Sequence, residues 1–181
     1  MADKLRGSYA TDSGMHCIWD PASFSAIHDY DTWETELLAD KDIRRHIQAG
    51  HFVPVNIQSD GVFNIEVRVG SAEEPSALSD REAEYLVVSS EPYLFASNGA
   101  LCVSGIEHVE GQPSDTVGSL DLASGEYAVT VHLIGWDEEP GMVAEDGTPK
   151  PEALPDFVVL VNPLAGDVSF RTEVETFDQP E

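Results

Sequence analysis

Short apolar runs that alternate with polar residues fill the chain after residue 50, and this pattern most limits how it can fold. The segment 62–69 is the clearest case, because its apolar and polar side chains occupy alternating positions. The apolar positions are Phe63, Ile65, Val67 and Val69, and the polar positions are Asn64, Glu66 and Arg68. Successive side chains of a strand point to opposite faces of a sheet. The segment is therefore predicted to be a half-buried strand.

Turn residues between such runs predict three hairpins, since Asp-Gly and Asn-Gly pairs favour the tight turns that join antiparallel strands. The predicted turns are Ser59-Asp60-Gly61, Asn98-Gly99 and Ser124-Gly125; they separate 52–58 from 62–69, 93–96 from 100–106, and 120–122 from 127–136. Further strands are expected at 16–19, 85–90, 157–162 and 168–174. The segment 157–162 is apolar throughout, which predicts a central strand covered on both faces.

One segment, 31–49, has the periodicity of a helix. Asp31 and Glu34 match a capping box at its start, and Gly50 suits the left-handed position that ends a helix. About nine strands and one helical segment near the N-terminus predict a mainly β chain, specifically a two-layer antiparallel β-sandwich. An α+β fold, with the helix across one face of a sheet, is the alternative.

The length of 181 residues suits one domain. We expect a flexible N-terminal arm at 1–14, a single β-sandwich domain at 15–177 and a polar tail at 178–181. No apolar stretch approaches the roughly 20 residues that span a bilayer, and no secretory signal is visible. A cytoplasmic location is therefore expected by default. Cys17 and Cys102 are expected to be reduced and buried in such a location.

The charge of the chain limits its partners. There are 34 Asp and Glu residues against 9 Lys and Arg, a formal net charge of −25, and the interval from 82 to 149 holds 13 carboxylates and no Lys or Arg. Such a surface repels nucleic acid and anionic membranes and attracts cations or basic proteins. We therefore expect a basic protein partner, no nucleic acid and no membrane. Adaptation to high salt is an alternative cause, and it predicts carboxylates spread over the whole surface.

Familiar catalytic motifs are absent from the sequence, including G-x-S-x-G, H-E-x-x-H, the Walker loop and G-x-G-x-x-G. His132 could act as a general base in a ligand-binding or hydrolytic sandwich, because histidine titrates near neutrality. Glu107 and His108, with Glu110 close by, could suggest a metal site. Neighbouring residues on a regular strand point to opposite faces, so we expect no metal site there. No catalytic residue and no cofactor are predicted.

The string Trp136-Asp137-Glu138-Glu139 is the most distinctive local feature. A bulky aromatic residue at the end of a strand precedes three carboxylates and a Pro-Gly turn. Tryptophan offers packing area and a face for cations, and carboxylates steer the approach of a basic protein. These four residues are the predicted contact with a partner. A solvated turn in which Trp136 plugs the edge of the core, and a hard-cation site, are the alternatives.

Two stretches resemble a known group at the level of pattern. They are Gly125-Glu126-Tyr127-Ala128-Val129 and 155–163, which follow an early acidic helix and an Asp-Gly turn. This order is similar to that of small acidic bacterial β-sandwich proteins, which include competence-nuclease inhibitors (ComJ-like) and toxin-immunity proteins. The resemblance covers roughly 50–163. It implies a stoichiometric inhibitor that covers a basic nuclease or toxin, with no catalytic residues to carry over.

The function predicted from the sequence is therefore a non-enzymatic acidic binding module, an inhibitor or immunity protein that masks a basic nuclease or toxin. The two alternatives are a ligand-binding or hydrolytic sandwich that uses His132, and a salt-adapted structural domain with no dedicated partner face. The sequence predicts no oligomeric state.

Overall fold

The computed structural model describes residues 3–174 and 177, and its architecture is mainly β, as predicted. The strands are β1 (Lys4–Thr11), β2 (Met15–Trp19), β3 (Phe52–Asn56), β4 (Gly61–Val69), β5 (Leu86–Ser89), β6 (Tyr93–Gly105), β7 (Gly118–Ile134) and β8 (Phe157–Pro163). The helices are α1 (Tyr30–Leu37), α2 (Asp40–Ala49) and α3 (Asp80–Glu84), with 3-10 turns η1 (Pro21–Phe24), η2 (Ile106–His108) and η3 (Trp136–Glu138).

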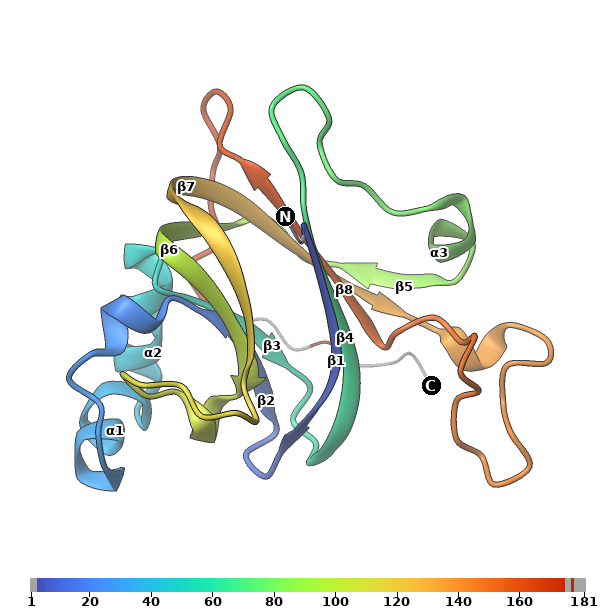
Figure 1. Cartoon of the computed structure of the whole chain (residues 1–181), viewed down its shortest axis with the longest axis horizontal. Coiled ribbons are helices and arrows are strands. Elements are labelled where there is room, and N and C mark those ends of the chain that lie inside the picture. The colour runs from blue at the N-terminus through green and yellow to red at the C-terminus, as the bar shows by residue number, and fades with distance from the viewer. Residues whose placement is uncertain (1–2, 175–176, 178–181) are drawn as a thin grey trace.

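The strands form one eight-stranded sheet in the order β1-β4-β8-β7-β6-β2-β3, and β5 also pairs with β7. The predicted two-layer β-sandwich takes the form of a single sheet that curls over on itself (Figure 1). The curl brings Tyr9 of β1 against Gly118 of β7, although these strands are not neighbours in the sheet. The pairing is antiparallel except between β4 and β8, which are parallel. The expectation of a wholly antiparallel arrangement was therefore wrong.

Two of the predicted hairpins do not exist, because β6 and β7 each run straight through the predicted turn. Asn98-Gly99 and Ser124-Gly125 face each other in the β6–β7 ladder, where the register shifts between Ser97 and Gly99. Gly99 has φ 123° and Gly125 has φ 152°, so both glycines are used for an irregularity within long strands. Each of these two pairs of predicted short strands is therefore one long strand.

The third predicted hairpin is also wrong. β3 pairs with β2, whereas β4 pairs with β1 and β8, so the turn at Asp60-Gly61 connects strands that are not partners. The amides of Ile57 and Gln58 instead donate to the carbonyl oxygen of Gly14, at 3.1 and 2.9 Å. The connection therefore packs on the β1–β2 turn.

The N-terminus is not a flexible arm over its predicted length of 1–14. Residues 4–11 form β1, which pairs with β4 from Lys4 opposite Arg68 to Thr11 opposite Gly61. The inner face of β1 places Tyr9 and Thr11 in the buried interior, and this burial secures the strand. At the other end, 168–174 is not a strand, contrary to prediction, and the expected tail at 178–181 lies outside the described residues.

β8 confirms the prediction of a central strand. It lies between β4 and β7, and 157–161 are buried. Phe157, Val159 and Val161 belong to the main core inside the curl. Val158 and Leu160 belong to a second cluster on the opposite face, with Ile134 and Leu154, and Trp136 packs against this cluster. The strand is thus covered on both sides.

The helical region consists of two helices instead of one. α1 is capped by Asp29, two residues before the predicted cap, with Thr32 completing the capping box. α2 ends at Gly50 with φ 80°, as predicted. Both cysteines are buried and free, also as predicted. Among residues 3–174 and 177, no helix is long and apolar enough to cross a membrane.

Candidate protein-interaction sites

The predicted contact at Trp136 forms the 3-10 turn η3, two residues after β7 ends. Trp136 is half-buried, and its indole Nε1–H donates to Oδ1 of Asp156 at 2.8 Å. Its ring packs against the second core cluster. Trp136 therefore anchors the turn to the body of the protein, and only part of its surface is accessible.

The three carboxylates after Trp136 differ in their surroundings. Asp137 and Glu138 are exposed. Glu139 accepts two hydrogen bonds from Arg81, from Nε at 2.8 Å and from Nη2 at 2.7 Å. These bonds lower the pKa of Glu139, since they favour its charged form. Arg81 also donates to the carbonyl oxygen of Glu152. Of these three carboxylates, Asp137 and Glu138 thus have no cationic partner among the described residues.

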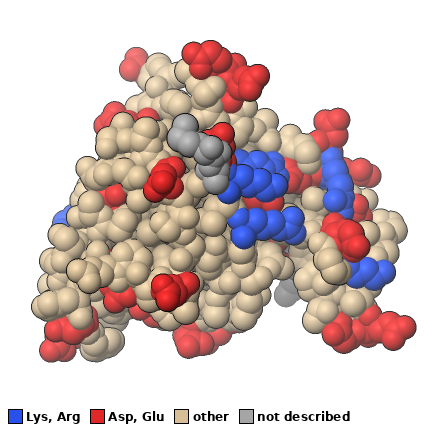
Figure 2. All heavy atoms as spheres, viewed as in Figure 1, with Lys and Arg blue, Asp and Glu red and all other residues tan. Residues whose placement is uncertain are grey.

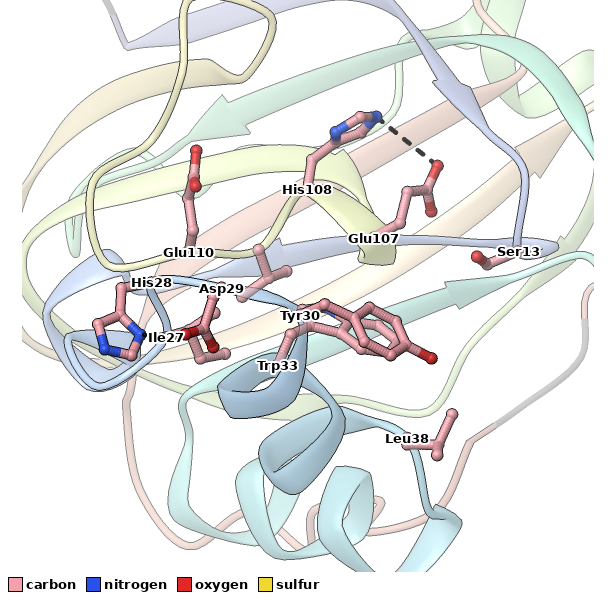
Figure 3. Close-up of a pocket in the computed structure, with 11 residues that line it drawn as sticks. Ser13, Ile27, His28, Asp29, Tyr30, Trp33, Leu38, Glu107, His108 and Glu110 are labelled. Atoms are coloured by element: carbon pink, nitrogen blue, oxygen red, sulfur yellow. Dashed lines mark ion pairs between the residues drawn. The ribbon is translucent and has the colours of Figure 1, made fainter.

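A second candidate site is a groove between the start of α1 and η2, which the sequence analysis did not predict (Figure 3). Its volume is about 530 Å³. One wall carries aromatic and apolar side chains from α1 and its flanks, and the other carries polar side chains from η2 and the residues after it. The apolar wall consists of Ile27, Tyr30, Trp33 and Leu38, and the polar wall of Glu107, His108 and Glu110.

The cap of α1 explains how the aromatic wall is built. Asp29 Oδ1 accepts the backbone amide of Thr32 at 2.9 Å, which starts the helix at Tyr30. Residues three apart on a helix are neighbours, so Tyr30 and Trp33 stack with ring centroids 6.1 Å apart and planes 19° apart. Trp33 Nε1–H donates to the carbonyl oxygen of Ile106 at 2.9 Å. This bond fixes the indole, while Tyr30 remains 66% exposed.

The carboxylates of the groove come from three separate positions. Asp29 lies at the start of α1, Glu107 in η2 and Glu110 just after η2. Glu107 is held by the β1–β2 turn, because it accepts from Thr11 Oγ1 and from the amide of Asp12, each at 2.9 Å. No hydrogen bond or ion pair joins Glu110 to another described residue. Of the three carboxylates in the groove, Glu110 therefore has the fewest hydrogen-bond and ion-pair partners among the described residues.

The expectation that Glu107 and His108 would point to opposite faces of a strand is wrong. Both residues line the groove, because they sit in a 3-10 turn and not in a regular strand. His108 Nε2 lies 3.7 Å from Glu107 Oε1 (Figure 3). Glu107, His108 and Glu110 thus come together, but within the described part of the chain no group of His, Cys, Asp and Glu is arranged to hold a metal ion.

His132, the alternative catalytic residue, lies in β7 and is 9% exposed. Its Nδ1 lies 2.7 Å from Ser89 Oγ and its Nε2 2.9 Å from Thr130 Oγ1, so both ring nitrogens are already engaged. Burial lowers its pKa. His132 lines neither the groove nor a smaller hollow of about 260 Å³ beside Asp156. No carboxylate among the described residues hydrogen-bonds the ring, so this geometry does not favour a hydrolytic role.

The positive charges of the chain are largely engaged by its own acids. Glu66 is 1% exposed and lies 2.9 Å from Lys4 Nζ and 2.6 Å from Arg68 Nε. Figure 2 shows Asp and Glu spread over the visible face, whereas Lys and Arg gather in its centre and on its right. This face therefore carries no single dense acidic lobe.

The fold and these sites define a mainly β protein with one curled sheet and two acidic surface sites. A comparison with solved structures finds two similar chains. The product of "Crocagin biosynthetic gene J" is 16% identical with a TM-score of 0.57, covering 89% of this chain and 96% of that one. ComJ from Bacillus subtilis, an inhibitor of the DNA-degrading activity of NucA, is 12% identical with a TM-score of 0.45, covering 88% and 96%.

The sequence resemblance pointed to the competence-nuclease inhibitors, and ComJ is such an inhibitor. At these identities the likeness concerns the fold alone. No protein-family model and no curated protein sequence matches the chain.

Proposed function

We propose that the protein is a non-enzymatic module that binds a basic protein through the turn 136–139. The observation that carries the proposal is the exposure of Asp137 and Glu138 on a turn that is fixed from both sides. Trp136 is tied to Asp156, and Glu139 is tied to Arg81. The two exposed carboxylates are therefore presented by a firm support.

This geometry divides the predicted contact residues into two roles. Asp137 and Glu138 meet the basic partner, while Trp136 and Glu139 hold the turn in place. Association costs free energy when side chains and loops must be ordered, and a turn that is already ordered avoids part of that cost. Exposed charges at the edge of a contact mainly accelerate association and make it dependent on salt. The expected signature of this site is thus a salt-sensitive association rate.

The finer part of the proposal is that the partner is a basic nuclease or another toxin, which the bound protein masks. This part is supported by the resemblance of the sequence pattern to competence-nuclease inhibitors and immunity proteins. A stoichiometric inhibitor needs no catalytic residues of its own. The satisfied surroundings of His132 agree with such a role.

The test uses a basic nuclease encoded beside the gene for this chain or, if no such gene is present, a panel of basic bacterial nucleases. Association rates and inhibition of DNA degradation are measured at about 50 and 500 mM salt, where the Debye length falls from about 14 to 4 Å. The test variant is Asp137→Asn with Glu138→Gln. The matched control is Asp121→Asn with Glu126→Gln, which removes two exposed charges from β7.

We expect the test variant to slow association at low salt by about tenfold and to flatten its salt dependence, and the control to change the rate far less. An unchanged rate for the test variant overturns the assignment of the turn. Equal slowing by both variants shows that only net charge matters, and it overturns the local assignment as well.

A salt-adapted domain without a partner is a second candidate, which the even spread of acids in Figure 2 favours. It predicts that the free energy of unfolding rises steadily with KCl, because salt screens repulsion among the acids. It also predicts no saturable binding to any basic nuclease of the panel. The kinetic experiment therefore separates the two candidates.

A further inference from the structure

The groove between α1 and η2 is a separate surface from the acidic turn. In Figure 1, α1 lies at the left end of the molecule, and the loop that follows η3 lies at the right end. The two sites draw on different elements, and no residue belongs to both. A contact in the groove is therefore independent of a contact at 136–139.

The charge of the groove fits a cation. Three carboxylates line it, from Asp29, Glu107 and Glu110, and no Lys or Arg is among its lining residues in the described chain. Glu107 is already satisfied by Thr11 and Asp12, and Asp29 by Thr32, whereas no hydrogen bond or ion pair joins Glu110 to another described residue. A cation placed in the groove is attracted by all three carboxylates.

The aromatic wall fits a planar group. Tyr30 is stacked on Trp33 and exposes 66% of its surface, so a ring face or edge is accessible on the groove side (Figure 3). The bond from the Trp33 indole to Ile106 holds the pair in position. Trp33 packs against the main core, but Tyr30 is not among the residues that do so. The exposure of Tyr30 is thus the feature that core packing leaves unexplained.

We propose that this groove binds an arginine side chain presented by a basic protein partner. A guanidinium group stacks on aromatic rings and at the same time donates to carboxylates in its own plane, which a lysine ammonium group does less well. Tyr30 provides the stacking surface and Glu110 provides the acceptor, while Asp29, Glu107 and Trp33 keep the walls in place.

The negative charge of the groove favours an arginine side chain over a second copy of this chain and over an apolar side chain. A second copy of this chain would bring another strongly acidic surface against the three carboxylates, which is unfavourable. A purely apolar side chain would cover the carboxylates of Glu107 and Glu110 without satisfying them, and desolvation of unpaired charges opposes binding. An arginine side chain satisfies the aromatic and the acidic wall together.

The test titrates the full-length protein with a short arginine-containing peptide and, in parallel, with peptides in which citrulline, lysine or leucine replaces the arginine. Binding is followed by calorimetry and by the NMR signal of the Trp33 indole N–H, which is assigned with Trp33→Phe. The groove variants are Tyr30→Ala and Glu110→Gln. The control variants are Val62→Ala, an exposed apolar residue of β4, and Glu126→Gln, an exposed carboxylate of β7.

We expect the arginine peptide to shift the Trp33 indole signal and to bind tighter than the lysine peptide, with citrulline and leucine weaker still. Tyr30→Ala and Glu110→Gln should each weaken binding about three- to tenfold, and the controls by less than about twofold. Asp137→Asn with Glu138→Gln should leave the indole shift intact, so a failure of the turn assignment is distinguishable from a failure of the groove assignment.

Four results overturn the proposal. The first is equal weakening by Glu110→Gln and Glu126→Gln, which reduces the effect to total charge. The second is equal binding of the citrulline or leucine peptide, which shows that the groove does not recognise the charged guanidinium group. The third is self-association that Tyr30→Ala abolishes, which makes a second copy the occupant. The fourth is an unshifted Trp33 signal at saturating peptide.

Discussion

The indole N–H of Trp136 donates to the carboxylate of Asp156 at 2.8 Å, and this bond connects the acidic turn to the start of β8. The other carboxylate oxygen of Asp156 accepts the backbone amide of Asn64 in β4 at 2.7 Å. One side chain therefore links the turn to two adjacent central strands. Burial raises the pKa of Asp156, and the two donors offset part of that effect.

Replacing Asp156 with Ala should loosen the turn and destabilise the fold. The change leaves the amide of Asn64 and the indole of Trp136 without their acceptor, and each unpaired buried donor costs about 1–3 kcal/mol. We expect the free energy of unfolding in urea to fall by about 2–4 kcal/mol. Asp137→Ala, at an exposed site one residue after Trp136, is the control and should leave stability nearly unchanged. Similar losses for both variants would contradict the role of Asp156.

Arg68 is predicted to be the most important cation for stability. Its guanidinium contacts Glu66 and Glu82, two carboxylates that are 1% and 3% exposed. Arg68→Met leaves these buried charges short of a partner, and such a loss costs about 3–5 kcal/mol. Lys4 and Arg6 still reach Glu66, so we expect the lower end of this range.

The control for Arg68 is Arg44→Met, which removes an exposed ion pair with Glu173. Exposed pairs contribute about 0–1 kcal/mol, so this variant should unfold at nearly the wild-type urea concentration. If Arg68→Met were no more harmful than Arg44→Met, the buried network would not stabilise the fold.

The two glycine pairs in β6 and β7 show why part of the fold could not be predicted. A Gly residue after Asn or Ser signals a backbone position with positive φ, and both Gly99 and Gly125 do have positive φ. A tight turn and a bulge use that conformation equally well. The choice depends on the partner strand, because the two irregularities face each other across the ladder. Local sequence predicted the conformation correctly and the topology wrongly.

A matched substitution tests this use of glycine. A Cβ added at Gly99 or Gly125 would meet no atom within 4 Å, so the cost of Gly→Ala there is backbone strain alone. We expect each of Gly99→Ala and Gly125→Ala to lower the free energy of unfolding by about 1–3 kcal/mol. Ser124→Ala, at an exposed neighbouring position, should be close to neutral. Neutral glycine variants would mean that the long strands do not need the positive φ.

The two surface sites were predictable to different degrees. The turn at Trp136 is formed by consecutive residues, so its aromatic and acidic character can be seen in the sequence. The pairing of Glu139 with Arg81 joins distant parts of the chain and could not be predicted in this way. The groove combines α1 with η2, which are far apart in the chain. Trp33 lies in the segment 31–49 that was predicted to be helical, but Tyr30 lies just before that segment, and nothing near either residue indicates the opposite wall. A site that joins segments far apart in the chain has no local signature in the sequence.

A pair of histidines should make the fold sensitive to mild acid. His46 of α2 and His51, just before β3, lie with their Nδ1 atoms 3.1 Å apart, and His46 Nε2 lies 2.8 Å from Glu36 Oε2 in α1. Burial is the main cause that lowers the pKa of both histidines, while nearby Arg45 lowers them further and Glu36 acts in the opposite direction. Both rings are therefore neutral in the folded protein near neutral pH.

The lowered pKa values of His46 and His51 determine how stability changes with pH. The unfolded chain binds protons at about the ordinary histidine pKa of 6.5, and the folded chain binds them only at lower pH. Stability contributed by the neutral pair is full above about pH 6.5 and is lost progressively as the pH falls toward the lowered folded values. The carboxylate of Glu36 has a lowered pKa and so acts only in a more acidic window.

We expect the urea midpoint to fall between about pH 7.5 and 5.0 in the wild type, and His51→Asn to reduce that fall, since one of the two buried titrating rings is gone. His28→Asn, at an exposed histidine outside the pair, is the matched control. The chain also buries His16 and His132 with lowered pKa values, so part of the slope should remain in His51→Asn. If the urea midpoint fell equally with pH in His51→Asn and in the wild type, the histidine pair would not contribute to the pH dependence of stability.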